Sequence, residues 1–140
     1  MMYGNDPAQY RNFFREAWRK HRERLPLEPL EDLVARIVAA HPEYHALLDS
    51  PDAPEQHYTP ESGQTNPFLH MGLHIAIQEQ LAADRPAGIR ALYQKLVQRS
   101  ADAHDVEHRM AECLTECMWE AQRSGSAPDE SAYLERLRRL

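Results

Sequence analysis

Residues 65–81, TNPFLHMGLHIAIQEQL, decide the fold class, because this stretch is apolar on more than one side and still carries two histidines. Asn66 is a good helix N-cap, and Pro67 suits the first helical position, where a missing N–H removes no hydrogen bond. At 100° per residue, one side carries His70, His74, Ile77 and Leu81, and another carries Phe68, Met71 and Ile75. The stretch therefore predicts a central helix over 67–83 that is buried on more than one face.

The composition describes an acidic protein of ordinary domain size. The 140 residues are enough to bury a core without disulfides, so we expect a single domain over residues 1–140. A net charge of −6 argues against general nucleic-acid binding, although it allows a local basic patch. No apolar run approaches the length of a membrane span, and the only cysteines, Cys113 and Cys117, suit reduced buried thiols. These features predict a cytoplasmic protein.

Helical periodicity continues on both sides of the central stretch, and no strand pattern occurs. Proline, glycine and capping residues separate the apolar periods from one another. Besides the central helix, the predicted helices cover about residues 7–23, 30–41, 89–97 and 102–123 and a segment after Asp129. We therefore expect an all-α fold, a bundle of five or six helices around the 67–83 helix and the long 102–123 helix.

Six of the eight histidines form pairs spaced by four residues: His41 and His45, His70 and His74, His104 and His108. This spacing places two side chains on the same helix face, where they can chelate one metal ion. A packed neighbouring helix can complete such a site with an open position. Because Pro42 interrupts the first pair, the sequence favours as metal ligands His70, His74, His104 and His108.

We expect the two favoured pairs to lie close together around one divalent ion. Imidazole and carboxylate ligands suit zinc, iron, nickel or manganese about equally well. The alternative is that each histidine is structural and donates to a backbone carbonyl or lies at a helix edge. The sequence leaves both interpretations open.

Glu107 is the candidate catalytic residue of this site. On a helical wheel, His104 and His108 share a broad apolar arc with Ala111, Leu114, Met118 and Ala121, and Glu107 points into the middle of this arc. An unpaired carboxylate there would cost several kcal/mol, so it needs a partner. A metal ion, a protonated imidazole or Arg90 could supply one. Residues 104–108 also spell H-x-x-E-H, a motif in which two histidines bind zinc and the glutamate is a general base. That motif's family needs a distant downstream glutamate, and only 32 residues follow His108.

The first predicted helix carries a basic stripe beside its aromatic face, formed by Arg11, Arg15, Arg19 and Arg22. A positive strip on an acidic protein would attract an anionic partner, such as RNA phosphate, a lipid head group or an acidic protein surface. Glu16 and Glu23 dilute this charge. A solvated helix face is the alternative interpretation.

Four segments carry a family resemblance: HPEYHALL at 41–48, YTPESGQTNPFLHMGLHIAIQEQ at 58–80, DRPAGIRALY at 84–93 and HDVEHRMAECLTECMWEAQ at 104–122. From about Phe13 to Leu140, the chain resembles the bacterial family catalogued as domain of unknown function 1841. The resemblance implies a small helical bacterial protein to which no activity has been assigned. It carries over no catalytic residues.

Three functions follow from these patterns. The first is a divalent-metal-binding protein, with a metal-dependent hydrolase as its enzymatic form. The second is a non-enzymatic interaction module that uses the first helix and the 49–64 loop. The third is a structural bundle whose histidines satisfy one another without metal. Metal analysis of the purified protein discriminates the first from the other two.

Overall fold

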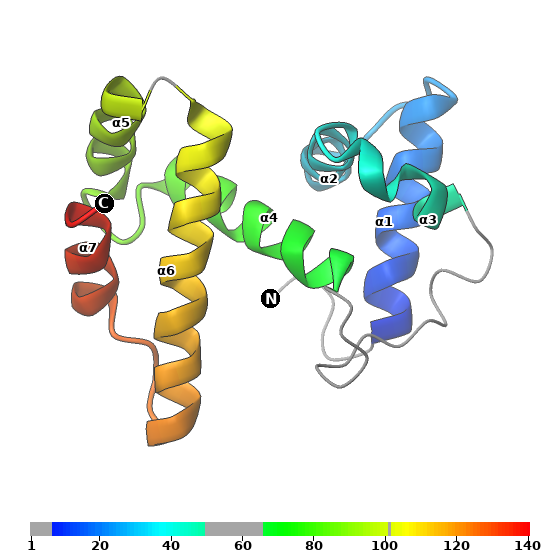
Figure 1. Cartoon of the computed structure of the whole chain (residues 1–140). Helices are drawn as coiled ribbons and strands as arrows, with labels where there is room; N and C mark the ends of the chain where they lie inside the picture. The colour runs from blue at the N-terminus through cyan, green and yellow to red at the C-terminus, as the bar shows by residue number, and fades with distance from the viewer. Residues whose placement is uncertain (1–6, 50–65, 101) are drawn as a thin grey trace. The chain divides into compact units, whose positions relative to one another are not determined.

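A computed structural model describes residues 7–49, 66–100 and 102–140, and within these ranges every regular element is helical (Figure 1). The elements are α1 (Pro7–Arg22), α2 (Pro29–Ala39), the 3-10 turn η1 (Pro42–Tyr44), α3 (His45–Asp49), α4 (Pro67–Ala83), α5 (Ile89–Ser100), α6 (Ala103–Ser124) and α7 (Glu130–Arg138). The prediction of an all-α fold is confirmed. The chain divides into two compact units, unit 1 (Met1–Ile75) and unit 2 (Ala76–Leu140).

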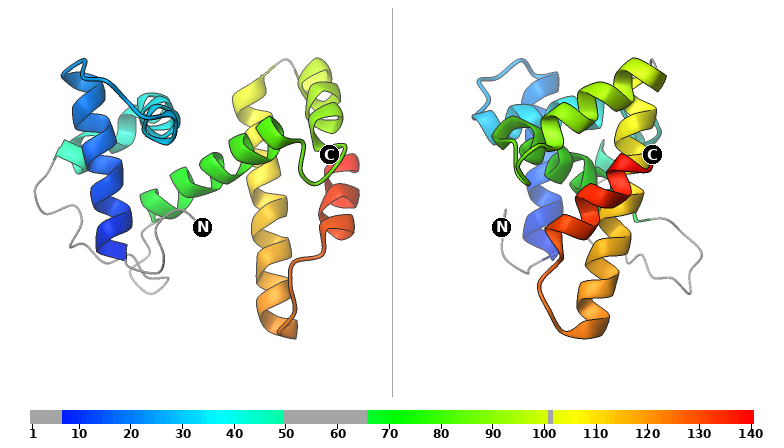
Figure 2. Two further views of the ribbon diagram at one scale, coloured as in Figure 1. Left: turned by 180° about the vertical axis from the view of Figure 1, so that it is seen from behind. Right: turned by 90° about the vertical axis from the view of Figure 1, so that its left-hand side faces the viewer.

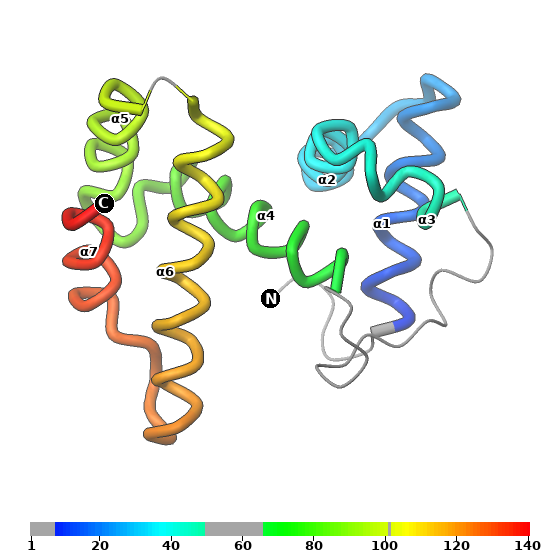
Figure 3. Tube along the Cα trace, viewed as in Figure 1, coloured from blue at the N-terminus to red at the C-terminus, as the bar shows by residue number. Residues whose placement is uncertain are grey.

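Local capping signals place the two helices that matter most, and Figure 3 traces both from end to end. Asn66 Oδ1 accepts from the N–H groups of Phe68 and Leu69, at 3.0 and 3.2 Å, and so begins α4. The side chain of Asp102 caps α6 in the same way. Gly125 ends α6 with φ 68°, a left-handed conformation that glycine adopts without strain. Apart from Asp49, the 49–64 loop that the sequence offers as part of an interaction module lies outside the described residues.

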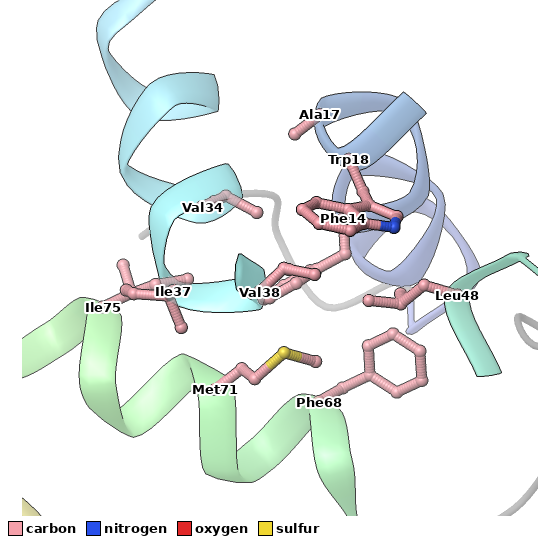
Figure 4. Packing of buried hydrophobic residues seen from close by; sticks show 10 residues of the cluster. All are labelled: Phe14, Ala17, Trp18, Val34, Ile37, Val38, Leu48, Phe68, Met71 and Ile75. Carbon is pink, nitrogen blue, oxygen red and sulfur yellow. The ribbon is translucent and has the colours of Figure 1, made fainter. Parts of the chain in front are cut away.

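Unit 1 has an aromatic core formed by α1, α2, α3 and the first half of α4. Figure 4 shows the buried side chains of these four helices directed toward one another. The rings of Phe14 and Phe68 meet edge to face, with centroids 5.7 Å apart. An added Cβ at Gly72 would overlap the Tyr10 hydroxyl, so glycine leaves room for the Tyr10 side chain at this point of α4.

Unit 2 has an aliphatic and sulfur-containing core. α6 packs against α5 and α7, and the two views of Figure 2 show these three helices side by side. The buried face of α6 carries Val106, Glu107, Met110, Ala111, Cys113, Cys117 and Ala121. Met118, which the helical wheel placed on the apolar arc, is 43% exposed, because the buried face is centred closer to Met110 and Cys117.

α4 supplies buried side chains to both units. Phe68, Met71 and Ile75 belong to the core of unit 1, whereas Ile77 is fully buried in the segment that belongs to unit 2. The prediction that this helix is buried on more than one face is therefore confirmed. Among the helices of the described ranges, none has the length and apolar character to cross a bilayer.

Candidate metal centre

Unit 1 brings three imidazoles together, those of His41, His70 and His74, which we call the histidine cluster. His70 and His74 lie one turn apart on α4, and their Nε2 atoms are 3.3 Å apart. The centroid of the His41 ring lies 5.2 Å from that of His70 and 4.8 Å from that of His74. His41 and His74 are each only 2% exposed, and His70 is partly buried.

His41 reaches the cluster because of the proline that follows it. Pro42 disfavours helical geometry in the residue before it, and His41 has φ −124° and ψ 69°, so α2 ends there. Its Nδ1 lies 2.7 Å from the carbonyl oxygen of Ile37. Since a carbonyl only accepts, Nδ1–H is the donor, and in the neutral ring the lone pair then lies on Nε2. A metal-ligating histidine is commonly oriented by this kind of hydrogen bond.

The 3.3 Å separation of the His70 and His74 Nε2 atoms is compatible with two arrangements. One is a hydrogen bond in which one ring donates and the other accepts. The other is a shared metal ion, because two nitrogens bound tetrahedrally at about 2.0 to 2.1 Å are about 3.3 to 3.4 Å apart. A ring nitrogen of His41 lies within 4.8 Å of one on His74, so a small movement would bring it into the same coordination shell.

Tyr44 and His45 are neighbours of the histidine cluster in the sequence and the fold, but they are not part of it. Tyr44 stacks on His41, with centroids 5.7 Å apart, and burial raises the pKa of its hydroxyl, which therefore stays protonated at neutral pH. His45 Nε2 donates to the carbonyl oxygen of Val38 at 2.8 Å, and its ring lies 4.4 Å from that of Trp18. His45 thus fits the structural role that the sequence left open.

The second predicted pair, His104 and His108, lies on α6 in unit 2. The two rings have centroids 4.2 Å apart, so they share a helix face as predicted. His104 is exposed and His108 is partly buried, which differs from the expectation that both face the core. The reason is that His104 lies in the first turn of α6, beyond the buried part of the helix. The prediction that this pair shares a site with His70 and His74 stays a prediction.

Glu107 is buried, as predicted, and one of its partners, Gln78, is not among those that the sequence pattern indicates. Its Oε2 accepts from Gln78 Nε2 at 2.9 Å, within unit 2. Arg90, which was one suggested partner, instead donates to the carbonyl oxygens of Leu81 and Ala82. It therefore satisfies the end of α4 rather than the carboxylate.

Cys113 and Cys117 are free and buried, which confirms the prediction of reduced core thiols. Burial raises the pKa of both thiols, so they are protonated at neutral pH. Arg136 Nη1 donates to Cys117 Sγ at 3.3 Å. Because both thiols are buried, neither has the accessible setting that a reactive cysteine needs.

The arginines of the basic stripe on α1 contact other residues of unit 1. Arg11 is buried, and its guanidinium lies 5.1 Å from the centroid of the Phe68 ring. Arg15 is partly buried, and its Nε donates to the carbonyl oxygen of Leu48 at 3.3 Å. Neither arginine lies on the fully solvated face that the helical pattern suggested.

The other two arginines are neutralised by carboxylates. Arg19 forms ion pairs with Glu16 and with Glu23. Arg22 forms one with Asp49 of α3, at 2.7 Å. The positive strip predicted from the sequence is therefore largely compensated inside unit 1.

Comparison with known proteins gives one match. The family model described as Domain of unknown function (DUF1841) matches residues 6–139. No curated protein and no solved structure matches the chain. The family match confirms the resemblance seen in the sequence, and its description assigns no activity.

Proposed function

We propose that this chain, which belongs to the family Domain of unknown function (DUF1841), is a divalent-metal-binding protein whose ligands include His41, His70 and His74. The observation that carries the proposal is the 3.3 Å separation of two Nε2 atoms one helical turn apart, beside a third imidazole. Three imidazoles are a common ligand set for zinc and suit iron, nickel and manganese as well.

The tautomer of His41 supports the proposal. A ring whose Nδ1–H donates to Ile37 has its lone pair on the other nitrogen, as a metal ligand requires. The burial of His41 and His74 also matters, because imidazoles are ordinarily half-exposed and need a reason to be buried. A metal ion would be such a reason.

We include His104 and His108 as further candidate ligands, and Glu107 as a candidate general base, on the sequence pattern. Bound to three imidazoles, a divalent metal ion would have an open position at which a water molecule is acidified. If the bound metal ion is catalytic, the protein would therefore be a metal-dependent hydrolase. Gln78 would hold the Glu107 carboxylate in place through its amide.

The first test is metal content. Untagged protein purified without chelator should contain stoichiometric metal, and zinc, iron, nickel or manganese should raise the melting temperature of metal-free protein. At a free metal concentration 100 times the dissociation constant, binding to the folded state alone would add about 2.7 kcal/mol of stability. Protein without metal, whose melting temperature none of the four ions moves, would support the structural bundle instead.

Variants separate ligands from neighbours. The double variant His70→Ala/His74→Ala and the single variant His41→Gln should lose metal and the metal-induced rise in melting temperature. His45→Ala is the matched control, because it removes an imidazole from the same unit outside the histidine cluster. Equal metal loss in His45→Ala would contradict the assignment of ligands.

His104→Ala and Glu107→Gln test the residues taken from the sequence pattern. His104→Ala should lower metal content if His104 is a ligand, and unchanged content removes it from the ligand set. Glu107→Gln should keep metal and lose any hydrolytic activity if Glu107 is a base. If Glu107 is only a buried carboxylate held by Gln78, the amide should be tolerated.

A further inference from the structure

A groove of about 540 Å³ lies between α1 and α3 of unit 1, away from the histidine cluster. Its walls include the indole of Trp18 and the side chain of Leu48, which are apolar, and the guanidinium groups of Arg15 and Arg22. We call it the α1/α3 groove. Two hydrogen-bond donors, one in its wall and one buried directly behind it, set it apart from an ordinary surface hollow.

The first donor is the indole N–H of Trp18. The side chain is only 8% exposed, yet within the described ranges Nε1 has no acceptor. An indole N–H can only donate, and a buried donor left without an acceptor costs about 1 to 3 kcal/mol. Figure 4 shows the indole nitrogen on the side of the ring that faces Leu48, which also borders the groove.

The second donor is the guanidinium of Arg15. Arg19 and Arg22 are each paired with carboxylates, but the described residues give Arg15 only the Leu48 carbonyl, which takes a single one of its five N–H groups. Arg15 and Trp18 are three residues apart on α1, so their side chains are neighbours on one helix face. A charged fork and the Trp18 side chain therefore border the same groove, with the indole N–H buried behind its wall.

We infer that the α1/α3 groove binds the carboxylate group of a small organic acid. The Arg15 fork matches the two oxygens of a carboxylate, and Trp18 and Leu48 cover an apolar body. The Trp18 N–H is buried directly behind this wall, where a carboxylate oxygen is the acceptor that it lacks among the described residues. Glu16, Glu23 and Asp49 also line the groove, and their charges disfavour a dianionic phosphate or a polyanion. The ligand class is thus a monocarboxylate with an apolar group attached.

Benzoate is a suitable probe. Calorimetry at fixed ionic strength should detect benzoate binding, weaker acetate binding because acetate lacks the apolar body, and no phosphate binding. In a Trp119→Phe background, the one remaining indole N–H resonance belongs to Trp18 and should shift as benzoate binds. Phosphate binding in preference to benzoate, or no binding of either carboxylate, would overturn the inference.

The matched variants act on the donors. Arg15→Gln should weaken benzoate binding by about tenfold or more, and Arg15→Lys should recover little of it, because lysine has the charge without the planar fork. Arg36→Gln, which removes an exposed cation from α2, should leave binding unchanged. Circular dichroism confirms that each variant is folded. Equal weakening in Arg36→Gln would mean that only overall charge matters, which would contradict the site.

Discussion

Units 1 and 2 satisfy their buried polar groups in different ways. In unit 1 the buried imidazoles donate to backbone carbonyls or face each other, as in His41 with Ile37 and His70 with His74. In unit 2 a buried carboxylate is held by a side-chain amide, Gln78 to Glu107. A metal ion can replace the single proton shared by two imidazoles, and one amide donor leaves the Glu107 carboxylate with acceptor capacity for a further partner. Both units therefore carry candidate ligand groups, clustered imidazoles in unit 1 and a carboxylate in unit 2.

The cores differ as well. Unit 1 is built around the rings of Phe14, Trp18 and Phe68, and unit 2 around aliphatic side chains, Met110 and two thiols. Each unit also contains one tryptophan, Trp18 in unit 1, which is buried, and Trp119 in unit 2, which is 56% exposed. This difference allows each core to be weakened and monitored by itself.

The largest effect should come from Phe14→Ala, because Phe14 is fully buried and contacts Phe68. We expect a loss of about 3 to 5 kcal/mol of unfolding free energy, since the substitution removes apolar burial and leaves a cavity. Urea unfolding followed by Trp18 fluorescence in a Trp119→Phe background measures it. Met110→Ala makes the corresponding change in unit 2, with an expected loss of about 2 to 5 kcal/mol. A loss below about 1 kcal/mol for Phe14→Ala would show that the aromatic core is not what stabilises unit 1.

A smaller effect is expected at Glu31 of unit 1. Its carboxylate accepts hydrogen bonds from Lys20 Nζ at 2.7 Å and from the backbone N–H of Glu28 at 2.9 Å. The bond from Glu28 is part of a capping box at the start of α2. Glu31→Gln should lower the unfolding free energy at pH 7 by about 1 kcal/mol. Asp102→Asn in unit 2 is the control, because asparagine keeps the capping oxygen.

The Glu31 effect should depend on pH. The Lys20 ammonium, with the Glu28 N–H, holds the pKa of Glu31 below its ordinary value. A depressed pKa in the folded state means that the stabilisation is complete above the ordinary value and is lost as the pH falls through the folded value. The difference between wild type and Glu31→Gln should therefore shrink below about pH 4. A difference that grows in acid would contradict this assignment.

The smallest effects should come from two surface ion pairs of the same kind, one within each unit. Asp32 and Arg36 of α2 are 3.1 Å apart, and Asp105 and Arg109 of α6 are 3.3 Å apart, each with the same i,i+4 spacing. Replacing either arginine by glutamine should change the unfolding free energy by no more than about 0.5 kcal/mol, and less at high salt. Thermal unfolding at two salt concentrations compares them. A loss above about 1 kcal/mol in only one unit would assign that arginine a further role.

Much of the helical order follows from short-range signals. Asn66 and Pro67 predict the start of α4, and Gly125 predicts the end of α6, because a cap bonds groups only two or three residues away. The wheel for α6 was less accurate, since Met118 and His104 are exposed. Which part of a helix is buried depends on the helices that pack on it, and these are distant in sequence.

The sequence by itself determined the helices, the all-α class and the one-turn pairing of His70 with His74, because each of these depends on neighbours along a single helix. Only the tertiary structure decided the rest of the candidate sites. His41 lies beside His70 because α2 and α4 pack in one core. Glu107 accepts a hydrogen bond from Gln78, which lies on another helix. Within the stripe of arginines, Arg22 is neutralised by Asp49, which lies 27 positions away in the sequence. The helical periodicity of a sequence predicts which residues lie on one face of a helix. Which residues contact that face depends on packing between segments that are far apart in the chain.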